Sequence, residues 1–84
     1  MIIDNKSYTQ INTNDSSYMI QNIGCGTIVG IFADEQPPPD ATYQVKLGPG
    51  DIISNKDWEG IFYAKSLTFE TASVGLTEIT GSIT

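Results

Sequence analysis

The sequence predicts an all-β protein, a small antiparallel β-sandwich or barrel of about six to eight strands. Short segments rich in β-branched and aromatic residues follow one another, with turn-forming residues between them. No window keeps apolar residues at helical spacing for two turns. The 84 residues are enough for one β-domain, 1–84, in which 1–15 is predicted as an N-terminal arm or edge strand and 16–80 as the β-sandwich core.

Seven segments have the composition of strands. Residues 42–48 alternate most clearly, because Tyr43, Val45 and Leu47 share one face while Gln44 and Lys46 share the other. The segment nearest the N-terminus has the weakest pattern. In chain order the predicted strands are 7–13, 17–23, 26–33, 42–48, 51–54, 60–67 and 72–80.

The segments between the predicted strands have turn chemistry. In the sequence LGPGD, Pro49 fixes φ near −65° and Gly50 can adopt a positive φ, which is the pattern of a type II turn. Residues 34–40 include three prolines, which predict an extended surface loop. Residues 54–60 form a polar loop that holds the only tryptophan, Trp58, a candidate exposed contact.

The segment 26–33 is apolar on both faces. Ile28 and Phe32 lie on one side, and Val29 and Ile31 lie on the other, so both sides need a cover. In a chain this small we expect another subunit to supply the second cover, with Thr27, Val29 and Ile31 as the candidate subunit interface. The predicted core is Ile20, Ile28, Phe32, Val45, Leu47, Ile52, Tyr63 and Leu76.

Three glycines with the spacing G-x-G-x-x-x-G surround the only cysteine, Cys25. A dinucleotide-binding loop needs a helix directly after its glycines, and prolines follow too soon for one to form here. The segment is instead predicted as a hairpin in which Gly24 and Gly26 supply positive φ values. Gly30, in mid-strand, indicates a bulge or a close approach to the backbone.

The composition excludes most kinds of catalysis and several kinds of partner. The chain has no histidine, no arginine and a net charge of −6, which disfavours nucleic acid and anionic membrane surfaces. Cys25 has no histidine to activate it, and one cysteine can form neither an internal disulfide nor a structural zinc site. We therefore expect no enzyme, no catalytic residue, no metal and no cofactor.

Two sets of carboxylates suggest alternatives. Asp57 and Glu59 flank Trp58, as a glycosidase pair with a sugar-stacking indole would, and Tyr63 would be a second sugar-binding ring. Solubility of the loop explains the same two carboxylates more simply. The other set consists of Asp34, Glu35 and Asp40, whose oxygen atoms would suit a calcium site. The alternative is that these carboxylates simply keep the loop solvated.

Three short motifs in residues 16–80 resemble those of small virion proteins of tailed bacteriophages. The first is an aromatic-led strand that ends in Asn22-Ile23-Gly24, and the second is Leu47-Gly48-Pro49-Gly50-Asp51 after a proline-rich loop. The third is Gly60-Ile61-Phe62-Tyr63-Ala64-Lys65, which has one residue more than the family pattern between its glycine and tyrosine.

The resemblance implies a non-enzymatic structural protein of the phage particle. Such proteins are small β-sandwiches or barrels that decorate or stabilise the capsid, or form part of the head or tail accessory structure, often as homotrimers. The implied partners are further copies of the chain and other virion proteins such as the major capsid protein, and the implied location is the virion, assembled in the host cytoplasm. The alternative is a carbohydrate- or receptor-binding β-module of a fibre or spike.

Overall fold

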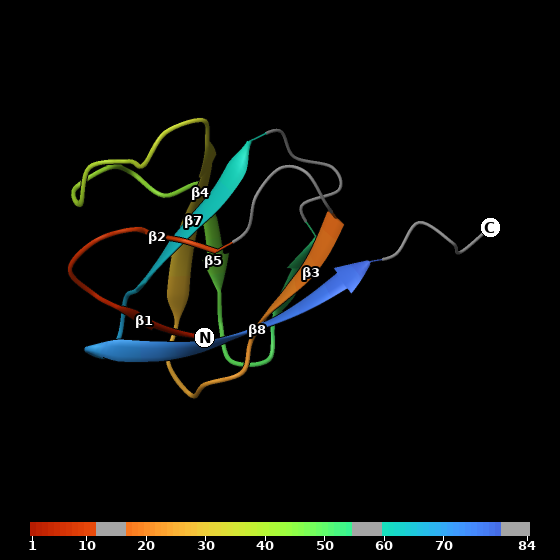
Figure 1. Ribbon diagram of the computed structural model, residues 1–84. Coiled ribbons are helices and arrows are strands. Elements are labelled where there is room, and N and C mark those ends of the chain that lie inside the picture. The colour runs from red at the N-terminus through yellow and green to blue at the C-terminus, as the bar shows by residue number, and fades with distance from the viewer. Residues whose placement is uncertain (12–16, 55–59, 80–84) are drawn as a thin grey trace.

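The computed structural model describes residues 1–11, 17–54 and 60–79, and in this part of the chain the protein is all-β. Two four-stranded sheets pack face to face as a β-sandwich, which confirms the predicted fold class (Figure 1). The strands are β1 (Ile2–Asp4), β2 (Thr9–Gln10), β3 (Ser17–Asn22), β4 (Ile28–Ala33), β5 (Val45–Leu47), β6 (Ile52–Ser54), β7 (Ile61–Ser66) and β8 (Thr71–Ile79).

Every described strand pair is antiparallel, and the strand orders are β1-β8-β3-β6 and β2-β7-β4-β5. The N-terminal segment gives one edge strand to each sheet, β1 beside β8 and β2 beside β7. β1 lies in residues 1–15, predicted as an arm or edge strand, but it was not among the seven predicted strand segments, because three residues are too few to show an alternating pattern. Of the strand predicted at 7–13, the structure forms β2 at Thr9–Gln10, and residues 12 and 13 lie outside the described residues.

The connection between β3 and β4 differs from the predicted hairpin. β3 pairs with β6 and β8, whereas β4 pairs with β5 and β7, so the chain crosses from one sheet to the other. Gly24 and Gly26 do not have positive φ values, which among the described glycines occur only at Gly50 and Gly60. Gly26 is needed for space instead, since a Cβ there would lie 2.6 Å from the Phe69 ring.

The strand β5 is shorter than the alternating pattern predicted. The backbone N–H of Phe32, in β4, donates to the side-chain oxygen of Gln44 at 2.9 Å. A side chain therefore replaces the backbone acceptor that a longer β5 would have supplied. Tyr43, predicted to share one face with Val45 and Leu47, is 42% exposed.

The core lies between the sheets and contains most of the residues predicted for it. Ile20, Ile28 and Phe62 have no exposed surface, and Val45 is partly buried against them. The buried residues of this core are Ile3, Ile11, Ile20, Ile28, Phe32, Leu47, Phe62, Ala64, Ala72 and Val74.

Two predicted core residues are exposed. Ile52 is 52% exposed because its neighbour Ile53 packs against the core, and a run of two isoleucines does not show which one faces inward. Leu76 shares the inner face with Val74 but is 37% exposed. It lies toward the end of the nine-residue strand β8, which projects beyond the second sheet in Figure 1.

A second apolar cluster covers the outer face of the β2-β7-β4-β5 sheet. Val29, Ile31 and Tyr63 are buried there beneath Tyr8 and the partly buried Ala41 of the proline-rich loop. The cover that we expected from another subunit thus comes from the chain itself. With Val29 and Ile31 buried in the protomer, the reason for placing a subunit interface on them no longer holds, and Thr27 is only half-buried beside them.

Polar contacts hold the proline-rich loop over this cluster. The Tyr8 hydroxyl donates to the Ala41 carbonyl at 2.8 Å, and the Gln36 side-chain amide donates to the Tyr8 carbonyl at 2.7 Å. The Lys65 ammonium donates to the Pro39 carbonyl and lies 4.8 Å from the centre of the Tyr8 ring. Tyr8 is therefore the residue on which the loop depends most.

We expect stability to fall in alkaline solution because of Tyr8. Burial raises the pKa of its phenol above the ordinary value of 10.0, and Tyr43 raises it further. Above that ordinary value the unfolded chain loses a proton that the folded chain keeps, so the free energy of unfolding decreases as pH rises. Urea denaturation of the wild type and of Tyr8→Phe at pH 8 to 11 measures this, and equal pH slopes for the two proteins would contradict it.

Candidate docking surface

Two of the three phage-like motifs meet at one corner of the sandwich, around the buried side chain of Asn22. Its amide nitrogen donates to the carbonyl oxygens of Gly26 at 2.7 Å and Leu47 at 3.0 Å. Its amide oxygen accepts from the Gly24 N–H at 3.1 Å. Asn22 thus joins the crossing between the sheets to the end of β5, which explains a polar residue with no exposed surface.

The second motif forms the predicted type II turn. Gly50 has a φ of +85°, and the Asp51 N–H donates to the Gly48 carbonyl at 3.0 Å. The Asp51 carboxylate accepts from the Gly48 N–H at 2.8 Å, which stabilises the turn from inside. Asn22 binds the turn through its backbone as well, donating to the Asp51 carbonyl at 3.0 Å and accepting from Gly50 at 2.8 Å.

This corner fixes the positions of two exposed isoleucines. Ile23 follows Asn22 and is 58% exposed, and Ile52 follows Asp51 and is 52% exposed. Both lie on the outer side of the β1-β8-β3-β6 sheet, together with Met19 at 40% and Ile2 at 67% exposed. We call these four side chains, with the strand positions between them, the apolar outer face.

The strand register makes this face continuous. Ser73 lies opposite Ile2 and accepts a backbone hydrogen bond from Ile23, so it lies between the two isoleucines. Gln21 lies between Gly75 and Ile52 in the same way. A Cβ at Gly75 would lie 3.2 Å from Ile23, so this glycine lets the Ile23 side chain lie flat against β8.

In residues 1–11, 17–54 and 60–79, no charged side chain lies in the centre of the face, although the N-terminal ammonium donates to the Val74 carbonyl of β8 at 3.0 Å. Charged side chains occur at the border of the face. The strands of this sheet contain no lysine, whereas the other sheet carries Lys46 in β5 and Lys65 in β7. The bordering carboxylates belong to Asp4, Asp51 and Glu70, all of them exposed. Burial of the centre of the apolar outer face against another protein therefore requires no charged side chain of the described residues to lose its water.

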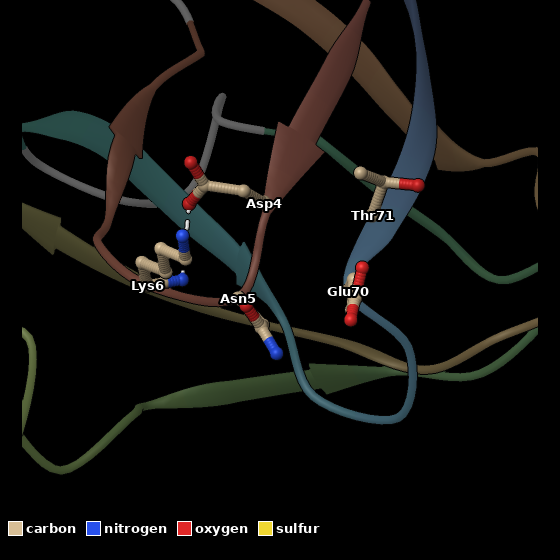
Figure 2. A pocket seen from close by; sticks show the side chains of 5 residues that line it. All are labelled: Asp4, Asn5, Lys6, Glu70 and Thr71. Atoms are coloured by element: carbon tan, nitrogen blue, oxygen red, sulfur yellow. Dashed lines mark hydrogen bonds between the residues drawn. The ribbon is translucent and has the colours of Figure 1, made fainter.

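A shallow hollow of about 340 Å³ lies at the border between β1 and β8 (Figure 2). It is lined by Asp4, Asn5, Lys6, Glu70 and Thr71. The Asp4 carboxylate accepts from the backbone N–H groups of Lys6 and Ser7 at 3.0 and 3.3 Å, and Figure 2 shows it turned away from Glu70. The two carboxylates do not converge, so the hollow does not hold an acid–base pair.

The residues suggested for sugar binding are not brought together. Tyr63 is only 6% exposed and belongs to the second apolar cluster, so a sugar cannot stack on its ring. Trp58, Asp57 and Glu59 lie outside the described residues.

The suggested calcium ligands do not form a metal site in the described residues. Asp34, Glu35 and Asp40 are exposed on the proline-rich loop, and no group of three potential metal ligands occurs in residues 1–11, 17–54 and 60–79. Cys25 is exposed in the crossing between the sheets. The same described ranges contain no helix long and apolar enough to cross a membrane.

In the part of the chain that the structure describes, fold and surface together define a small all-β sandwich with an apolar outer face on its β1-β8-β3-β6 sheet. Comparison of the chain with family models, curated proteins and solved structures gives no match. The resemblance to phage virion proteins therefore rests on the motif residues alone, of which two sets build the Asn22 corner.

Proposed function

We propose that this chain is a non-enzymatic structural protein of a tailed-bacteriophage particle. It decorates or stabilises the capsid, or forms part of the head or tail accessory structure, as a homotrimer bound to other virion proteins such as the major capsid protein. The observation that carries the proposal is the apolar outer face, held in place by the two motifs on which the family resemblance rests.

The magnitude of burial supports a role in assembly. Complete burial of an isoleucine or methionine side chain contributes about 1.5–3 kcal/mol, and the four residues of the face are roughly half exposed. Their further burial would contribute roughly 3–6 kcal/mol, which approaches the cost of at least about 4 kcal/mol for bringing two proteins together. Repetition of such contacts over a particle would make the association stable.

The composition of purified particles tests this function. Virions of the phage that encodes the chain would be purified on a density gradient and analysed by quantitative mass spectrometry. We expect the chain in the particle fraction at a fixed ratio to the major capsid protein. A chain found only in the unassembled fraction, with none in the particles, would contradict the proposal.

A further inference from the structure

We draw no further inference here: the strongest candidate, the apolar outer face of the β1-β8-β3-β6 sheet, carries none beyond the proposed function, because nothing in the described residues shows what covers it.

Discussion

Replacement of Asn22 by alanine is expected to lower the free energy of unfolding by about 3–5 kcal/mol, because each buried polar group left without a partner costs about 1–3 kcal/mol. The change removes the partners of the Gly24 N–H and of the carbonyl oxygens of Gly26 and Leu47. A chain of 84 residues has a total stability of roughly 4–13 kcal/mol, so the variant would be close to unfolding. Urea denaturation followed by circular dichroism measures the difference.

The control for this prediction is Gln21→Ala, which changes the preceding residue of the same strand. The Gln21 side chain donates one long hydrogen bond, of 3.3 Å, to the Gly50 carbonyl near the surface. Asn22→Asp is a second variant of equal size, and it replaces the two donated bonds with repulsion between a carboxylate and two carbonyl groups. It should be at least as unstable as Asn22→Ala at neutral pH. A single ordinary hydrogen bond contributes about 1 kcal/mol to stability. If both Asn22 variants lowered the free energy of unfolding by less than this, the result would contradict the structural role of the Asn22 side chain.

Replacement of Phe62 by alanine is the second change with a large expected effect, a loss of about 3–5 kcal/mol. Phe62 has no exposed surface, and its ring centre lies 4.7 Å from that of Phe32. The ring also lies directly against Gly30, where a Cβ would be 2.3 Å from two of its carbon atoms. Gly30→Ala alone is therefore expected to cost about 1–3 kcal/mol through overpacking.

The two changes are expected to compensate each other. In the absence of the Phe62 ring, the methyl group of Gly30→Ala enters the vacated space, and its remaining close contact is the Tyr63 carbonyl oxygen at 3.2 Å. Adding Gly30→Ala to Phe62→Ala should therefore cost clearly less than Gly30→Ala costs alone. A double-mutant cycle from denaturation curves measures the coupling. Phe62→Leu replaces Phe62→Ala in the cycle where the alanine variant does not fold. Additive losses would contradict the close approach of this ring to the backbone.

Local chemistry in the sequence predicted the fold class and one turn correctly. Gly50 and its preceding proline specify a type II turn within four residues, and no distant contact is needed to form it. The strands could also be predicted locally, because the preference of β-branched residues for extended backbone does not depend on distant contacts. Gly30 was predicted to mark either a bulge or a close approach, and the Phe62 ring decides in favour of the approach.

The crossing between the sheets could not be predicted from adjacent residues. Two strands joined by a glycine-containing segment suggest a hairpin, and only the bonds of Asn22 to Gly26 and Leu47 distinguish the crossing from it. Leu47 is 25 residues away in the chain. The cover over Val29 and Ile31 was missed for a similar reason, since Tyr8 and the proline-rich loop reach it from distant positions.

The apolar outer face was missed because its residues alternate with the core residues of the same strands. Met19 directly precedes the buried Ile20, and Ile23 directly follows the buried Asn22. The hydrophobicity of the side chains alone favours Ile23 over Asn22 as a core residue. The sequence held one signal that Asn22, and not Ile23, is the buried residue, namely the Asn-x-Gly motif. An asparagine whose side chain binds a following backbone N–H forms a turn at that point in the chain.

Oxidation of Met19 by peroxide tests most directly the central claim that the chain acts by burying its apolar outer face against another protein surface. Met19 lies on this face and is 40% exposed in the single chain. Its rate of sulfoxide formation would be compared by mass spectrometry in purified particles and in the dilute free chain. The account predicts a rate several-fold lower in particles, and equal rates in the two samples would contradict it.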